Sequence, residues 1–140
     1  RQALAAKQFG AGAYIVFNAA GGPGNGVIKE AKERTQRGEV RWAIGVDKDQ
    51  CADGVYAPGK SAVLTSMMKR VDVAAHDVAV MVRDGRFAGG QLLTFSLKNK
   101  GVGLPASNPN VPADILAQAA AYGERIAAGQ LPVSEIPAKR

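Results

Sequence analysis

The stretch from Ala13 to Gly26 reads AYIVFNAAGGPGNG and decides the fold class. Residues 13–18 form a short apolar run rich in β-branched and aromatic side chains, which is typical of a buried strand in a parallel sheet. A glycine-rich loop, 19–26, follows this run. Residues 27–37 then place apolar side chains on one helical face and charged side chains on the other. A strand, a glycine loop and a helix in this order indicate an α/β domain.

The same alternation continues outward from this stretch in both directions. Short apolar runs alternate with segments whose apolar residues recur at helical spacing. We therefore expect an α/β fold with a Rossmann-like parallel sheet and helices on both faces. The expected strands are 13–18, 41–47, 61–66 and 91–97, and the expected helices are 3–9, 27–37, 71–82 and 113–128. Residues 131–140 are expected to form a loose C-terminal tail.

The composition is that of an ordinary globular domain, with 140 residues, 46% hydrophobic and 21% charged. The net charge of +6 raises the question of a nucleic-acid partner. Basic and acidic residues alternate along 29–39, however, which favours a solvated surface and no nucleic-acid partner. No apolar run approaches the roughly 18 residues of a membrane span, and no signal peptide opens the chain. Because the first residues read as a helix entered partway along, we expect the chain to begin inside a larger protein.

Few residues in this sequence are suited to catalysis or to metal binding. Cys51 is the single cysteine, so neither a disulfide framework nor a cysteine-based zinc site is expected. His76 is the single histidine and has no evident serine or cysteine partner in the pattern. No nucleophile–base set or cluster of metal ligands is visible. We expect a binding protein without a cofactor rather than an enzyme.

Ligands of open parallel sheets bind beyond the carboxyl ends of the strands. The segments to consider are therefore 18–26, 47–50 and 66–70. In the glycine loop, the spacing G-x-G-x-G is neither that of a dinucleotide fingerprint nor that of a phosphate loop. Such a loop lets backbone amides approach a ligand closely, but a tight structural turn explains it equally well.

Two charged residues follow the next two expected strands. Asp47 could accept hydrogen bonds from neighbouring hydroxyls, as an acid does when it binds a ribose diol, or could be a cap or a surface acid. Lys69 could donate to a ligand, pair with Asp47, or be solvated. Because the carboxyl ends of parallel strands meet at one edge, we expect Gly21, Asp47 and Lys69 to converge.

Several segments taken together resemble the C-terminal half of the basic membrane protein family, also called PnrA-like or Med lipoproteins. The similarity extends from about residue 3 to residue 133, in the order of the family. The segments that carry it are 14–26 (YIVFNAAGGPGNG), 42–50 (WAIGVDKDQ), 63–72 (VLTSMMKRVD), 101–104 (GVGL) and 108–112 (NPNVP).

The resemblance implies a type I periplasmic-binding fold with two lobes and a cleft. It implies that residues 1–130 belong to the C-terminal ligand-binding lobe, without its opening strand and without the N-terminal lobe. Members of the family are extracytoplasmic, are often lipid-anchored, bind nucleosides and serve ABC permeases. In the doubly wound order, we expect the absent strand between those at 13–18 and 41–47. Cys51 lies inside the chain and cannot carry the lipid, so any membrane contact would be through an anchor that this chain lacks.

The resemblance also implies roles for particular residues. Gly21 and Gly22 would approach the ligand, Asp47 would hold the ribose hydroxyls, and Lys69 would reach the ribose or the base. The aromatic residues that stack on the base would come largely from segments that this chain lacks. Two alternatives remain open, namely a dinucleotide-binding domain of an oxidoreductase and the ligand-sensing lobe of a transcription regulator.

Overall fold

The computed structural model describes residues 2–134 and residue 136, and it divides the chain into two compact units. The first unit comprises the residues up to Arg70 together with Gly103–Val111. The second unit comprises Val71–Val102 together with the residues from Pro112 onward. The assignment of residues 1–130 to one lobe stays a prediction.

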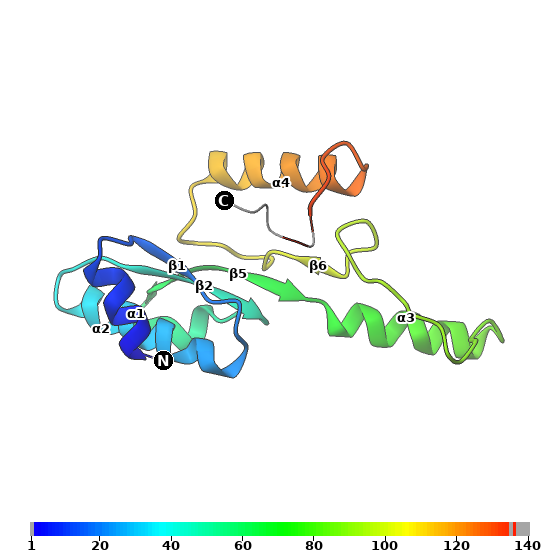
Figure 1. Cartoon of the computed structure of the whole chain (residues 1–140), viewed down its shortest axis with the longest axis horizontal. Coiled ribbons are helices and arrows are strands. Elements are labelled where there is room, and N and C mark those ends of the chain that lie inside the picture. The colour runs from blue at the N-terminus through cyan, green and yellow to red at the C-terminus, as the bar shows by residue number, and fades with distance from the viewer. Residues whose placement is uncertain (1, 135, 137–140) are drawn as a thin grey trace. The chain divides into compact units, whose positions relative to one another are not determined.

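The first unit contains most of the regular structure, and strands alternate with helices along it (Figure 1). Its elements are α1 (Gln2–Gly10), β1 (Ile15–Phe17), the 3-10 turn η1 (Gly22–Gly24), α2 (Asn25–Gln36), β2 (Trp42–Asp47), the 3-10 turn η2 (Cys51–Gly54), β3 (Val55–Ala57), β4 (Lys60–Ser61) and β5 (Val63–Lys69). The short strand β6 (Val102–Gly103) lies at the boundary between the units. The expected loop between β2 and β5 thus contains η2 and the antiparallel pair β3–β4.

The four-stranded sheet has the order β1-β2-β5-β6. Strands β1 and β2 pair in parallel with Ile15 opposite Trp42, and β2 and β5 pair in parallel with Asp47 opposite Met68. The expected α/β class with a parallel sheet is confirmed. The expectation of an absent strand between β1 and β2 is wrong, because these two strands are hydrogen-bonded neighbours. The helix α2 connects them directly, as a crossover between adjacent parallel strands does.

The expected strand 91–97 is also wrong, because this segment has no strand structure. The amide of Ser96 donates to Asn99 Oδ1 at 2.7 Å, and Asn99 Nδ2 donates to the carbonyl oxygen of Thr94 at 2.9 Å. The polar groups of the segment are therefore used in a local turn rather than in a ladder. Leu92 is 94% exposed, so the apolar run does not enter the core. The fourth strand of the sheet is β6 instead.

The core of the first unit lies between the sheet and the helices α1 and α2, which lie side by side in Figure 1. The buried side chains that form it are Ala5, Phe9, Val16, Ile28, Ala31, Ala43, Ala62 and Val63. Because side chains alternate along a strand, burial of Val16 leaves Ile15 and Phe17 on the opposite, exposed face of β1.

A charged network joins α1 to α2 beside this core. Glu30 is buried and accepts hydrogen bonds from Arg34 Nε at 2.8 Å and from Gln2 Nε2 at 3.0 Å. Arg34 also donates to the carbonyl oxygen of Ala6 and lies over the ring of Phe9. The hydrogen bonds from Arg34, and next those from Gln2, hold the pKa of Glu30 below its usual value.

Two asparagines attach the segment 105–111 to β5. Asn110 Nδ2 donates to the carbonyl oxygen of Val63 at 2.7 Å, and Asn108 Oδ1 accepts a hydrogen bond from the hydroxyl of Thr65. Asn108 also donates to the carbonyl oxygen of Pro105 at 2.7 Å. The NPN motif therefore joins this segment to the sheet through side chains rather than through a strand ladder.

The second unit contains the amphipathic helices α3 (Val71–Arg83) and α4 (Ala113–Ala127), which confirm the expected helices 71–82 and 113–128. None of the described side chains of either helix is buried. Of the expected tail, 131–134 has no regular structure, whereas residues 135 and 137–140 lie outside the described residues. Within the part of the chain that the structure covers, no helix combines the length and the apolar character that crossing a membrane requires.

Candidate ligand-binding site

The structure brings Gly21, Asp47 and Lys69 together at the carboxyl edge of the parallel sheet. Lys69 Nζ lies 2.9 Å from Asp47 Oδ1. A Cβ atom placed on Gly21 would lie 3.6 Å from Asp47 Oδ2. The convergence expected from the strand ends is confirmed as geometry, because β2 and β5 run in parallel and end side by side. That these residues bind a ligand stays a prediction.

The backbone at Asp47 turns sharply away from strand β2. Asp47 has a φ of 70°, in the left-handed region, and the amide of Lys48 donates to the carbonyl oxygen of Val46 at 2.9 Å. This hydrogen bond closes a γ-turn centred on Asp47, and residues other than glycine rarely adopt the positive φ that it requires, although aspartate and asparagine do so more often than most. The strand thus ends in a tight turn that places the carboxylate at the rim.

The ion pair between Asp47 and Lys69 is exposed to solvent. The side chain of Asp47 is 45% exposed and that of Lys69 is 62% exposed. Exposed ion pairs contribute little stability, typically between 0 and about 1 kcal/mol. Of the roles that the sequence allows for Lys69, the structure thus contains the ion pair with Asp47. Because breaking the ion pair costs so little free energy, both side chains can exchange their mutual contact for contacts with a ligand.

The glycine loop leads from β1 into α2 through the 3-10 turn η1. Gly21 has a φ of 51° and a ψ of −137°, a combination that residues with a Cβ atom avoid. Gly22 opens η1, and a Cβ atom added to it would meet nothing within 4 Å. Gly22 is therefore on open surface next to Gly21.

Asn18 lies beneath this loop, where the sequence analysis assigned no role. It is 5% exposed, and neither amide atom of its side chain has a hydrogen-bond partner among the residues that the structure describes. Its side chain fills the space that a Cβ atom on Gly24 would need. A polar residue at the end of an apolar strand was the signal in the sequence that could have singled out Asn18.

Gln50 is a second residue to which the sequence analysis gave no role. It is 4% exposed, and its side chain and its backbone amide form four hydrogen bonds. The partners are the amide of Val46, Ser66 Oγ, Asn25 Oδ1 and Asp53 Oδ2, at 3.0 to 3.1 Å. Since these partners lie up to 25 positions away along the chain, no local sequence pattern could have indicated this network.

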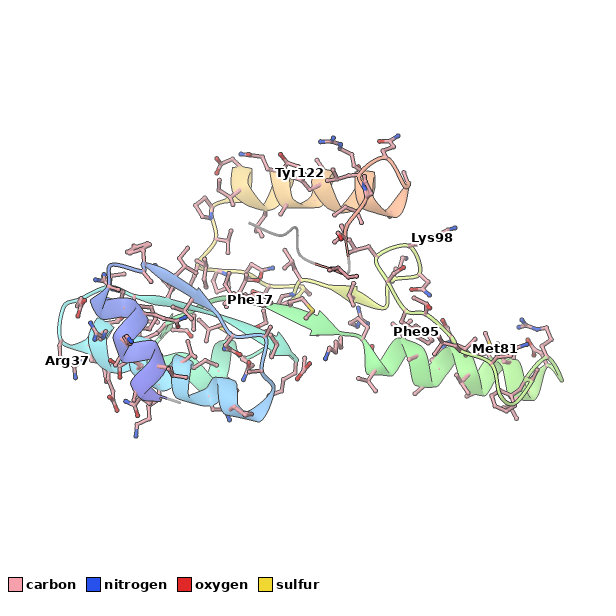
Figure 2. All side chains as sticks on the ribbon, in the orientation of Figure 1. Phe17, Arg37, Met81, Phe95, Lys98 and Tyr122 are labelled. Carbon is pink, nitrogen blue, oxygen red and sulfur yellow. The ribbon has the colours of Figure 1, made fainter. Side chains whose placement is uncertain are left out.

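Phe17 projects from β1 as an exposed aromatic ring, at the end of the strand that lies on the carboxyl edge of the sheet (Figure 2). It is 51% exposed and directly precedes Asn18 at the carboxyl end of the strand. The expectation placed the aromatic residues of the site largely outside this chain. An apolar ring that the core does not bury is a candidate for contact with a ligand.

The described residues provide no alternative centre of reactive groups. No cluster of three or more histidine, cysteine or acidic residues that could hold a metal ion occurs among them. A hollow of about 470 Å³ lies elsewhere, along α2 and Asp53, and contains none of Gly21, Asp47 and Lys69. Four of its seven lining residues are charged, and it lies away from the strand ends where ligands of parallel sheets bind, so we take the strand edge as the candidate site.

The first unit is thus a parallel α/β unit with a glycine loop, an acid and a lysine at its carboxyl edge. Residues 1–136 match the family described as Bmp, ABC transporter substrate-binding protein PnrA-like. The chain therefore belongs to this family, as the resemblance suggested.

Two relatives support this assignment at the level of sequence. A CD4+ T-cell-stimulating antigen of Listeria monocytogenes is 38% identical over 97% of this chain and 40% of its own length. The ABC transporter nucleoside-binding protein BmpA of Lactococcus lactis is 40% identical over 75% of this chain and 32% of its own length. The chain thus spans well under half of the length of these relatives.

Two solved structures share the fold. A transcriptional activator of the comK gene from Bacillus halodurans superposes with a TM-score of 0.75 at 23% identity, over 94% of this chain and 43% of its own. An ABC transporter solute-binding protein from Aeropyrum pernix gives a TM-score of 0.72 at 22% identity, over 95% of this chain and 43% of its own. At such identities the likeness concerns the fold alone.

Proposed function

We propose that this chain forms one wall of a nucleoside-binding site in the substrate-binding protein of an ABC importer. The observation that carries the proposal is the contact of Lys69 with Asp47 beside Gly21 at the carboxyl edge of the sheet. The three groups differ in chemistry and lie within reach of one small molecule. Membership in a family of substrate-binding proteins supports a binding role for this edge.

The chemistry of the three residues matches that of a ribose ring. An ionised carboxylate only accepts hydrogen bonds, so Asp47 suits the two neighbouring hydroxyl groups of a ribose. The ammonium group of Lys69 only donates, which suits a ribose oxygen or a ring nitrogen of the base. Gly21 and Gly22 have no side chains that would keep a ligand away from their backbone amides.

The base of the nucleoside requires an apolar surface. Phe17 offers an exposed ring at the end of β1, and stacking of a base on an aromatic ring is worth about 1–3 kcal/mol. Other aromatic rings are expected from the part of the relatives that this chain does not span. Small-molecule sites usually bury about 70–90% of their ligand, so a second wall is needed.

The proposal has consequences for partners and location. A substrate-binding protein delivers its ligand to the permease of its transporter, so we propose an ABC permease as the protein partner. We also propose an extracytoplasmic location, in the periplasm or on the outer face of the cell membrane, with a lipid anchor outside this chain. The name of the Lactococcus relative, a nucleoside-binding protein, supports the nucleoside class.

Calorimetric titration of the protein in its full natural length tests this function. The panel comprises adenosine, guanosine, inosine and free ribose, with NAD as the probe for a dinucleotide site. We expect at least one nucleoside to bind and ribose alone to bind much more weakly, because the base contributes its own contacts. Tight binding of NAD without binding of nucleosides would overturn the proposal in favour of a dinucleotide-binding domain.

A further inference from the structure

The three segments that carry the candidate site share one buried contact residue. We propose that Gln50 is a positioning residue, which holds the glycine loop, the turn at Asp47 and strand β5 in fixed relation. Its effect on ligand affinity rests on the proposed function, whereas its effect on the geometry of the rim does not.

Three hydrogen bonds of Gln50 reach three different segments. Its Oε1 accepts from the amide of Val46, the residue before Asp47, at 3.0 Å. Its Nε2 donates to Oδ1 of Asn25 at 3.1 Å, and Asn25 begins α2 within the glycine-rich stretch 19–26. Its backbone amide donates to Ser66 Oγ in β5 at 3.0 Å. One residue thus connects the segments that bear Gly21, Asp47 and Lys69.

The side chain of Gln50 has no spare donor for a ligand. Its second Nε2 hydrogen bond goes to Asp53 Oδ2 at 3.1 Å, so both donor positions are used. The residue is 4% exposed. Gln50 therefore acts on the rim through its neighbours rather than by touching a bound molecule.

The side chain of Gln50 is also closely packed. A Cβ atom on Gly45 would lie 2.9 Å from Cβ of Gln50 and 2.6 Å from Ser66 Oγ. The glycine at position 45 thus leaves room for Gln50 to reach the end of β2. An apolar residue in place of Gln50 would leave the buried amide of Val46 without its hydrogen bond, which is unfavourable, and would also remove the contacts with Asn25 and Asp53.

The variant Gln50→Glu tests the role with minimal change of shape. It keeps an acceptor for Val46 but turns the donor toward Asn25 and Asp53 into a carboxylate oxygen. A double variant combines Gln50→Glu with Asp53→Asn. The new asparagine supplies a donor to the carboxylate at position 50 and restores the net charge. Asp53→Asn alone is the control, because its side-chain oxygen still accepts from Gln50.

The first measurement is amide hydrogen exchange of the protein in its full natural length, without added nucleoside. We expect Gln50→Glu to speed exchange both in 46–53 and in 21–27, and the double variant to return both toward the wild type. Faster exchange confined to the residues that flank position 50 would overturn the proposal. If Gln50→Glu does not fold, Asn25→Ala removes the hydrogen bond between Gln50 and α2 and must speed exchange in 21–27.

The second measurement is calorimetric titration with adenosine and inosine, far below the unfolding midpoint of each variant. We expect Gln50→Glu to weaken affinity by about tenfold or more, and the double variant to recover most of this loss. Unchanged affinity in folded Gln50→Glu, with a wild type that binds, would show a structural role only and overturn the proposal. A wild type that binds no nucleoside would refute the proposed function, and hydrogen exchange alone would then decide the role of Gln50.

Discussion

Lys69 Nζ and Asp47 Oδ1 lie 2.9 Å apart at the edge where the parallel strands β5 and β2 end. The two residues are 22 positions apart in the sequence, and the parallel pairing of their strands alone brings them together. An acceptor and a donor side by side, both half exposed, can form complementary contacts with one polar ligand. This pair therefore provides the most direct tests of the site.

Replacing Asp47 by Asn removes one charge with little change of shape. We expect nucleoside affinity to fall about ten- to a hundredfold, because hydrogen bonds to a charged acceptor contribute about 1.5–3 kcal/mol. Asp53→Asn is the matched control, since Asp53 also pairs with an exposed lysine, Lys48, at 3.7 Å. Titration calorimetry measures both variants. Equal losses for the two would show that Asp47 does not hold the ligand.

Lys69→Met keeps most of the length of the side chain and removes its donor. We expect weaker nucleoside binding but almost unchanged stability, because the ion pair with Asp47 is exposed and contributes at most about 1 kcal/mol. Urea unfolding and calorimetry on the same sample separate the two effects. A large loss of stability with unchanged affinity would show that Lys69 serves the fold rather than the ligand.

Gly45→Ala should destabilise the first unit by about 1–3 kcal/mol, because the new methyl group overpacks the region around Gln50 and Ser66. Gly10→Ala is the control, since a Cβ atom at Gly10 meets nothing within 4 Å. Urea unfolding followed by the fluorescence of Trp42 measures both. Equal stability of the two variants would contradict the close packing at the end of β2.

The pKa of Glu30 predicts how stability depends on pH. Its folded-state pKa is below the reference value of 4.5, chiefly because of the hydrogen bond from Arg34. The unfolded state therefore binds the proton more tightly, so this contribution is complete above about pH 4.5 and is lost as pH falls toward the folded-state pKa. We expect Glu30→Gln to flatten the decline of the unfolding free energy in that range. Arg34→Met should flatten it as well, and an unchanged slope in both variants would refute this explanation.

The two units should differ in local stability when the 140-residue chain is studied alone. The helices α3 and α4 have no buried side chain among the described residues, whereas α2 and β2 each contribute to a core. Local opening is easiest where few apolar contacts are buried. We expect amide hydrogen exchange to be much faster in α3 and α4 than in α2 and β2. Equal protection of the four elements would contradict the description of the second unit.

The sequence was sufficient for the features that depend on local patterns. Apolar runs indicated β1, β2 and β5, and since parallel strands end at one edge, the meeting of Asp47 with Lys69 followed. The prediction of a strand at 91–97 was wrong because its apolar run resembles that of a strand, whereas the side chain of Asn99 forms hydrogen bonds with the backbone of the segment and stabilises a turn. The direct pairing of β1 with β2 was missed because strand order depends on tertiary contacts rather than on local sequence. The network of Gln50 was missed for the same reason.

The left-handed backbone at position 47 limits which residues can occupy it, whatever the ligand. Glutamate has the same charge as aspartate, but its longer side chain lacks the local hydrogen bonding that makes this conformation tolerable for aspartate and asparagine. Asparagine and glycine fit the turn but lack the charge. A change of Asp47 to any other residue thus sacrifices either the charge or the turn. Position 47 should therefore evolve slowly, since no single substitution preserves both properties.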